Sequence, residues 1–172
     1  MTQSQCFKDR YASEWGRSSR RERIAEEFIR LLLPGDLVAT GNGVECDAYT
    51  PEEGSMPDFY HRALGMWFEV TGSDLTREQS MQRCTAKFHR AEPCLFIREG
   101  KVEAARLNRV ASKLCFISVN EMDGSVLFLP CAKAVKYPLV EGYERGGERY
   151  YMVPWVEWMR PYRFVSSLRR EL

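Results

Sequence analysis

Apolar residues recur at every third or fourth position near the start of the chain. Ile24, Phe28, Leu31 and Leu32 follow this spacing, which gathers them on one face of a helix. A pair of serines precedes the run and a Pro-Gly pair follows it, and residues of these types commonly begin and end helices. The pattern therefore predicts a helix over about residues 20–33.

A second pattern, over residues 57–71, predicts two short strands joined by a turn. Asp58 lies near the start of the first strand. Glu69 lies inside the second strand, where Trp67, Phe68 and Val70 flank it. A carboxylate inside an apolar strand is destabilising unless it is paired or binds a cation. The hairpin brings the two acids together, so they form a candidate site for a hard divalent metal ion.

The rest of the chain supplies further elements of both kinds. In chain order they are a strand at 36–40, a turn at 41–43, a loop at 44–56, an apolar run at 95–97, a helix at 101–113, a strand at 114–119, a turn at 123–124, a strand at 125–129, and short helices at about 155–160 and 164–172. Residues 72–93 are polar and favour no element. This order predicts a mixed α/β fold, with a mixed central sheet flanked by helices.

Length and composition indicate one soluble domain. We expect a single domain over residues 1–172, with a core at about 20–131 and an aromatic and basic extension at about 137–172. No apolar run approaches the roughly 20 residues that a membrane span needs, and the polar N-terminal stretch does not resemble a secretory signal. We therefore expect a cytoplasmic, intracellular protein without a membrane partner.

The cysteine and histidine content argues against two common kinds of site. None of the six cysteines forms a CxxC pair, so a zinc site is not expected. Cys115 falls in an apolar run and is predicted to be a buried free thiol. The chain has only two histidines and no nucleophile elbow, so it offers no Ser/His/Asp triad.

Charge is unevenly distributed, although the net charge is only +1. Residues 34–74 contain eight acids and one base, and residues 75–113 contain nine bases and four acids. Such runs are most often solvated faces. An acidic centre between basic flanks also suits a metal site beside a phosphate-binding surface. The candidate phosphate contacts are Arg20, Arg21, Arg83, Arg90, Arg106 and Arg109.

The order of elements resembles that of the PD-(D/E)xK nuclease superfamily, and in particular the archaeal Holliday-junction resolvases. A charged amphipathic helix, RRERIAEEFIRLL, comes first and leads to a strand. Pro57-Asp58 then begins the hairpin, and Glu69-Val70 follows on its second strand. A later basic helix leads into LCFISV and a closing strand. The resemblance covers roughly residues 20–131.

The resemblance implies a Mg²⁺ (or Mn²⁺) cofactor with Asp58 and Glu69 as ligands. It also implies that the backbone carbonyl of Val70 is a ligand. In the superfamily a glutamate of the first helix commonly completes the site. Glu22 and Glu26 lie one helical turn apart on one face, and we prefer Glu26. A solvated helix acid is the alternative interpretation of each.

The chain departs from the superfamily at Thr71, because a lysine normally stands two residues after the glutamate. That lysine is thought to orient or activate the attacking water. Lys87 and Lys101 are the candidates to replace it from elsewhere in the chain. The alternative is that the protein has lost cleavage and only binds nucleic acid. His61 and His89 are further candidates for a chemical role.

The leading hypothesis is a metal-dependent DNA endonuclease whose substrate is branched DNA or a specific duplex site. A homodimer is expected, because symmetrical cutting of two strands needs two sites related by a two-fold axis. One alternative is a catalytically inactive nucleic-acid-binding protein on the same fold. Another is an intracellular protein-interaction domain in which the acids are structural.

Overall fold

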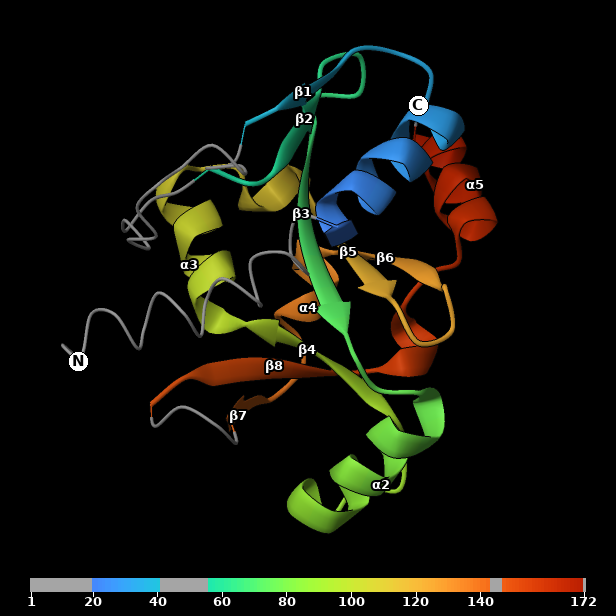
Figure 1. The fold of residues 1–172 in the computed structure, drawn as a ribbon. Coiled ribbons are helices and arrows are strands. Elements are labelled where there is room, and N and C mark those ends of the chain that lie inside the picture. The colour runs from blue at the N-terminus through green and yellow to red at the C-terminus, as the bar shows by residue number, and fades with distance from the viewer. Residues whose placement is uncertain (1–19, 41–55, 143–146, 172) are drawn as a thin grey trace, which may run out of the picture.

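The computed structural model describes residues 20–40, 56–142 and 147–171 (Figure 1). The larger of its two sheets has the strand order β1 (Leu37–Ala39), β2 (Phe59–His61), β3 (Met66–Ser73), β5 (Leu114–Asn120) and β6 (Val126–Pro130). Strands β3 and β5 run parallel, and the other neighbouring pairs run antiparallel. The expected mixed α/β class, with a mixed central sheet flanked by helices, is confirmed.

A helix over residues 20–32 covers one face of the larger sheet, as the apolar spacing predicts. Its buried residues Ala25 and Ile29 belong to the same core cluster as Phe68 of β3. Helix α5 (Pro161–Glu171) lies beside it on that face (Figure 1). The Phe164 ring of α5 stacks on Phe128 of β6, with ring centroids 4.4 Å apart. These contacts fix the first helix against β3, the strand that carries Glu69.

The opposite face of the larger sheet packs against α3 (Glu99–Leu107) and a second sheet. This second sheet has the strand order β4 (Cys94–Arg98), β8 (Arg149–Pro154) and β7 (Leu139–Glu141). Phe116 of β5 joins the core on this side, whereas its neighbour Ile117 joins the core beneath the first helix. Strand β5 is therefore buried on both faces, which explains why its sequence is apolar without alternation.

The C-terminal part of the chain is integrated into both cores. Strand β8 pairs with β4 along its whole length, and α5 packs beneath the larger sheet. The sequence pattern missed β7 and β8, because aromatic and proline residues around them obscure the alternation. Of the short helix expected at 155–160, only a 3₁₀ turn at Trp155–Glu157 is present, and the helix expected at 164–172 begins earlier, at Pro161.

The structure corrects two further expectations, both for segments that connect strands of the two sheets along the chain. Residues 72–93 contain a regular helix, α2 (Arg77–Phe88), which a Thr76–Gln79 capping box begins. The helix expected at 101–113 is shorter: α3 ends at Leu107, and Arg109 adopts a left-handed backbone with φ of 58°. A 3₁₀ turn at Ala111–Lys113 follows, and a short helix α4 (Cys131–Ala134) follows β6. The turn expected at 41–43 and most of the loop at 44–56 lie outside the described residues.

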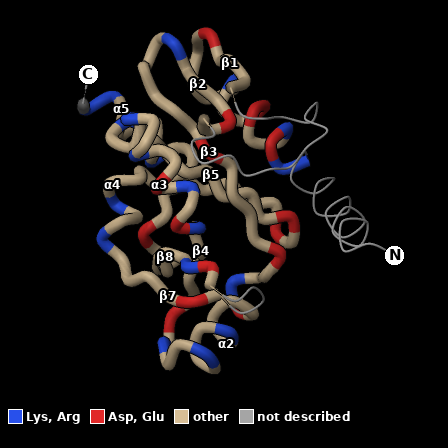
Figure 2. The backbone as a smooth tube through the Cα atoms, turned by 90° about the vertical axis from the view of Figure 1, so that its left-hand side faces the viewer, with Lys and Arg blue, Asp and Glu red and all other residues tan. Residues whose placement is uncertain are grey.

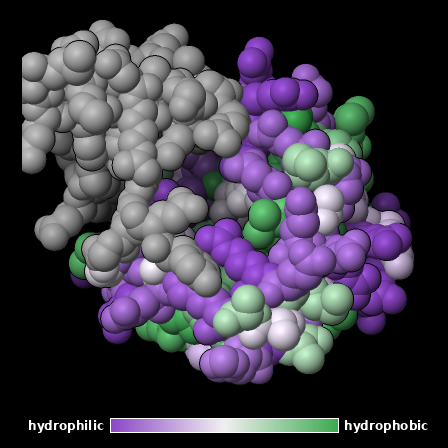
Figure 3. All heavy atoms as spheres, turned by 60° about the horizontal axis from the view of Figure 1, so that its bottom comes forward, coloured by the Kyte–Doolittle hydropathy of each residue, from purple (hydrophilic) through white to green (hydrophobic). Residues whose placement is uncertain are grey.

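The surface carries charge of both signs. Figure 2 shows basic and acidic segments interspersed along the backbone. Figure 3 shows a largely hydrophilic face with scattered apolar residues. Cys115 is a buried free thiol, as expected. In the described part of the chain, no helix has both the length and the apolar character needed to cross a membrane.

Candidate active site

Asp58 and Glu69 stand opposite one another at the end of the β2–β3 hairpin. Phe59 pairs with Phe68 in the register, so the next position outward on each strand is one of the two acids. Directly opposed residues of an antiparallel pair point to the same face. The Glu69 side chain is only 14% exposed. The hairpin thus brings together the two acids that the sequence singled out.

The unequal lengths of β2 and β3 explain the position of Asp58. Strand β2 has 3 residues and β3 has 8, so the edge of β3 extends beyond its partner. At this point the backbone N–H of Val70 donates to Asp58 Oδ2 at 2.7 Å. The Asp58 carboxylate therefore satisfies a backbone donor that a longer β2 would have satisfied.

Lys101 reaches the two acids from the first turn of α3. Its Nζ forms an ion pair with Glu69 Oε1 and donates a hydrogen bond of 2.6 Å to the Val70 carbonyl oxygen. Burial lowers the pKa of Lys101, but the negative charges of Glu69 and Asp58 raise it by more, so the net pKa is above the ordinary value. Lys101 is therefore a protonated cation at neutral pH.

Negative charge is concentrated around Asp58. Burial is the largest cause that raises the pKa of its carboxyl group well above the ordinary value, and the charge of Glu69 is the next. Lys101 opposes this rise, and the charge of Glu22 adds to it. Lys101 therefore offsets only part of the effect that burial and the neighbouring acids have on the pKa of Asp58.

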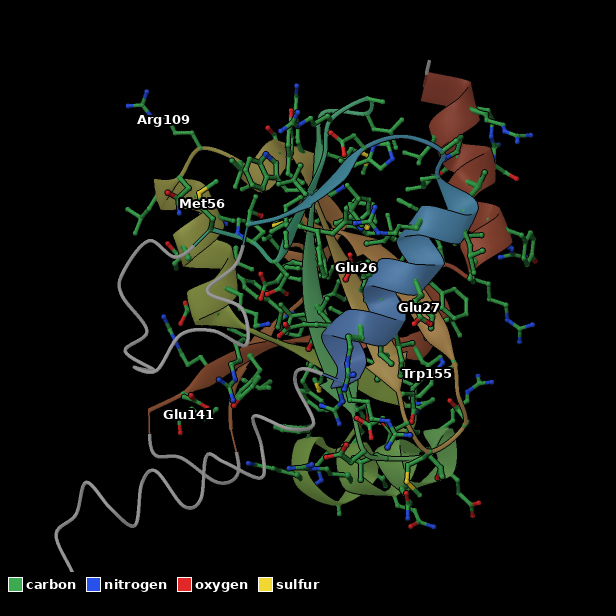
Figure 4. The ribbon with its side chains drawn as sticks, turned by 45° about the horizontal axis from the view of Figure 1, so that its top comes forward. Glu26, Glu27, Met56, Arg109, Glu141 and Trp155 are labelled. Carbon is green, nitrogen blue, oxygen red and sulfur yellow. The ribbon has the colours of Figure 1, made fainter. Side chains whose placement is uncertain are left out.

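The first helix contributes Glu22 to this cluster. Glu22 lies one turn before Ala25 on the face that packs against the sheet. The Glu26 carboxylate instead accepts a hydrogen bond of 2.8 Å from Arg30, one turn along the same helix. Figure 4 shows Glu26 and Glu27 on this helix. The geometry therefore favours Glu22 over Glu26, contrary to the preference drawn from the sequence.

The structure separates the two lysine candidates. Lys87 lies on α2, where its Nζ donates to the Glu141 carbonyl oxygen at 3.3 Å and sits over the Phe88 ring. Only Lys101 of the two is placed at the acids. Thr71, the position at which the superfamily has its lysine, lies on the same face of β3 as Glu69, because side chains alternate along a strand.

Neither histidine lies in a position that suits chemistry with the acids. His61 is fully buried, and its Nδ1 accepts a hydrogen bond of 3.3 Å from the Leu64 backbone N–H. Its Nε2 lies 3.3 Å from the Leu33 carbonyl oxygen and donates to it in the matching tautomer. His89 caps the C-terminus of α2 in a left-handed conformation.

Several arginines expected to contact phosphate have acidic partners. Arg21 pairs with Glu121 and Asp74, Arg90 pairs with Glu92, and Arg106 pairs with Glu103. Arg20 lies 3.9 Å from Glu121 and is largely exposed. Arg83 lies on α2, and Arg109 points away from the body of the protein beyond α3 (Figure 4).

Sequence reasoning missed one cation near the site. Arg98 ends β4 and directly precedes α3, and its charge lowers the pKa of Lys101. It pairs in register with Tyr150 of β8. The sequence carried no signal for it, because its proximity to Lys101 depends on a second sheet that the pattern did not reveal.

The donor atoms suit a hard cation. The Asp58 and Glu69 carboxylates and the Val70 carbonyl are all oxygen donors, the kind that Mg²⁺ and Mn²⁺ bind. Within residues 20–40, 56–142 and 147–171, no three His, Cys, Asp or Glu side chains are arranged as a ready-made metal cage. The geometry that fits a cation here is the gathering of these oxygen donors, because Glu69 and the Val70 carbonyl already hold the Lys101 ammonium group and Asp58 accepts a hydrogen bond from the Val70 N–H.

Comparison with known proteins agrees with this reading of the fold. The sequence model of the viral/archaeal nuclease family matches residues 55–162, which include Asp58, Glu69 and Lys101. The structure is similar to that of D212, a nuclease from a fusselovirus, with a TM-score of 0.52 and 19% sequence identity. That match covers 87% of this chain and 86% of D212. No curated protein matches the chain.

Proposed function

Because the chain belongs to the viral/archaeal nuclease family, we propose that it is a metal-dependent DNA endonuclease of the PD-(D/E)xK type in which Lys101 replaces the lysine absent at residue 71. The observation that carries this proposal is the position of the Lys101 ammonium group. It pairs with Glu69 and donates to the Val70 carbonyl, so a cation from α3 lies beside both acids of the hairpin.

The residues of the site divide into two roles. Asp58, Glu69 and the Val70 carbonyl would hold Mg²⁺ or Mn²⁺, with Glu22 as a further acid beside them. The bound ion supplies a Lewis acid for the phosphodiester and lowers the pKa of a bound water molecule. Protonated Lys101 orients the attacking water and stabilises the negative charge that develops on the phosphate.

The decisive experiment compares the two lysine candidates. Lys101→Ala is expected to lower the cleavage rate of plasmid DNA by about 10²–10³-fold, the usual effect of removing one group that stabilises developing charge. Lys87→Ala is the matched control and is expected to cleave at the wild-type rate, because Lys87 lies on α2. Equal loss in both variants, or none in either, contradicts the assignment of Lys101.

We extend the proposal to branched DNA as substrate and a homodimer as the active form. The support is the resemblance to Holliday-junction resolvases and the need for two sites related by a two-fold axis. Cleavage of a four-way junction in preference to a linear duplex of the same sequence is the expected result. Light scattering of the protein alone should give twice the 20.0 kDa chain mass.

A catalytically inactive nucleic-acid-binding protein is the second candidate, and one contact favours it. Lys101 engages two of the three oxygen donors that a metal ion needs, Glu69 and the Val70 carbonyl. If this contact persists with Mg²⁺ and DNA present, the protein binds DNA in a salt-sensitive way and does not cut it. Cleavage by the wild type that Asp58→Ala abolishes excludes this candidate.

A further inference from the structure

Arg21 is enclosed, whereas Arg20 and Arg23 on the same helix are exposed. Its side chain is only 16% exposed. Its Nε donates to Glu121 Oε1 at 3.0 Å, and its Nη2 forms an ion pair with Asp74. Glu121 follows β5 directly and Asp74 follows β3, so one guanidinium ties the first helix to the ends of two strands.

The Arg21 side chain packs against Gly72 of β3. A Cβ atom added at Gly72 would lie 2.5 Å from both Nε and Nη1 of Arg21, which is closer than non-bonded atoms approach. The Arg21 guanidinium therefore occupies the space that a side chain at residue 72 would need. Gly72 directly follows Thr71, and Glu69 lies three residues earlier on the same strand.

The next residue on the helix after Arg21 is Glu22, the acid whose charge acts on Asp58. Arg21 packs against Gly72 and pairs with Glu121 and Asp74, so its contacts fix this part of the helix against the ends of β3 and β5.

We propose that Arg21 is a positioning residue of the candidate active site: packed against Gly72 and paired with Glu121 and Asp74, it fixes this part of the first helix so that Glu22 lies beside Asp58. This inference rests on the proposed function, because it gives Glu22 a share in binding the metal ion. It also gives Arg21 a role other than the phosphate contact expected from the sequence, since two acids already hold its guanidinium.

Four variants test the proposal: Arg21→Gln, Glu22→Gln, the double variant and Gly72→Ala. Mn²⁺ binding is measured by calorimetry on the DNA-free protein, together with the Mn²⁺ concentration for half-maximal cleavage. Each single change is expected to weaken Mn²⁺ binding by about tenfold, as loss of a group that orients a ligand does. The double variant is expected to show the same tenfold loss, because Arg21 acts through Glu22.

Arg30→Gln is the matched control on the same helix. It breaks the exposed pair with Glu26 and is expected to bind Mn²⁺ as the wild type does. Thermal unfolding of every variant is recorded in parallel. A general loss of stability would lower the affinity further when Arg21→Gln is added to Glu22→Gln, whereas positioning of Glu22 would not.

Three results overturn the inference. The first is an additive loss of Mn²⁺ affinity in the double variant. The second is a lower melting temperature for Arg21→Gln with unchanged Mn²⁺ binding. The third is weaker metal-free DNA binding for Arg21→Gln with unchanged Mn²⁺ binding, which makes Arg21 a phosphate contact. If Asp58→Asn binds Mn²⁺ normally, the proposed function itself fails. If Asp58→Asn fails to bind Mn²⁺ while Arg21→Gln binds it normally, the proposed function stands and only the role of Arg21 is refuted.

Discussion

Asp58 occupies a position that its own negative charge disfavours. Its carboxylate is shielded from water and faces Glu69, and both effects raise its pKa. The hydrogen bond from the Val70 N–H and the charge of Lys101 compensate only in part. The fold therefore holds the two acids together against their mutual repulsion, an arrangement that is common at functional sites.

Asp58→Asn is expected to stabilise the metal-free protein as the pH rises. An acid with a raised pKa holds its proton more tightly in the folded state, so wild-type stability falls from about pH 3.9, the ordinary Asp pKa, up to the higher folded pKa. Asp58→Asn does not lose stability in this way, because asparagine has no carboxyl group to ionise. Urea unfolding in EDTA should give similar free energies for the two proteins near pH 3 and a widening advantage for the variant above it.

The amide is nearly isosteric and can still accept from the Val70 N–H, so lost packing does not obscure the comparison. A variant that is less stable than the wild type at pH 8 would contradict the interpretation of Asp58. Glu121→Gln is an unsuitable control, because Glu121 holds Arg21. Glu103→Gln, which breaks an exposed pair with Arg106 on α3, is suitable.

At the scale of elements, the lysine beside the two acids comes from α3 and not from β3. Helix α3 begins directly after β4, and its first turn brings Lys101 to the hairpin across a sequence separation of 31 residues from Val70. Residue 71 on β3 remains on the same face as Glu69. A lysine side chain from either element is therefore within reach of the same acids.

Thr71→Lys is expected to restore part of the activity that Lys101→Ala removes. The double variant should cleave DNA about tenfold faster or more than Lys101→Ala alone, a gain of about 1.4 kcal/mol in transition-state stabilisation. Thr71→Met in the same background is the control, because methionine is long and uncharged. The idea is refuted if the methionine and lysine variants cleave at equal rates.

His61 illustrates an element-scale role of a different kind. It joins the hairpin to the end of the first helix through Leu33, and Gly35 packs against its ring so closely that a Cβ there would lie 2.8 Å from Cε1. Its neutral imidazole, fully buried and hydrogen-bonded at both nitrogens, connects the element that carries the two hairpin acids to the element that carries Glu22.

His61→Ala is expected to lower the free energy of unfolding by about 2–4 kcal/mol, since it leaves a cavity and two unpaired backbone groups. The cleavage rate at saturating Mn²⁺, measured below the unfolding transition, should stay within a few-fold of wild type. His89→Asn is the control, because asparagine tolerates the left-handed backbone of that exposed cap. A loss of rate at unchanged stability would instead assign chemistry to His61.

At the scale of the whole molecule, the C-terminal part of the chain supports the elements that place Lys101 beside the hairpin acids. Strand β8 pairs with β4, the strand that leads into α3 and thus to Lys101. Val153 of β8 and Trp158 are buried in the same cluster as Ile97 and Phe116. The position of Lys101 therefore depends on residues much later in the chain.

Removal of residues 138–172 is expected to abolish cooperative unfolding. The truncated chain loses β8 and β7, the other two strands of the second sheet, and α5 from the core of the first, so apolar surface on both faces becomes exposed. Circular dichroism during urea unfolding should show a broad, non-cooperative change. A sharp transition at the wild-type midpoint would indicate that residues 20–137 fold independently.

Much of the site could be anticipated because its signals are local. The helix over residues 20–32 follows from apolar spacing, and the opposition of Asp58 and Glu69 follows from a short hairpin with a period of two. The shorter α3, the second sheet and helix α2 could not be anticipated in the same way. Their residues alternate weakly, and their conformations depend on partners distant in the sequence.

By itself the sequence determined the α/β class, the hairpin and the pair of acids, because strand period and turn chemistry act over a few residues. The tertiary structure decided which lysine lies beside the two acids, and which glutamate of the first helix acts on Asp58. Both choices depend on how α3 and the first helix pack against β3. Packing is set by the whole core, so spacing along the chain did not separate Lys87 from Lys101 and led to a preference for Glu26 over Glu22.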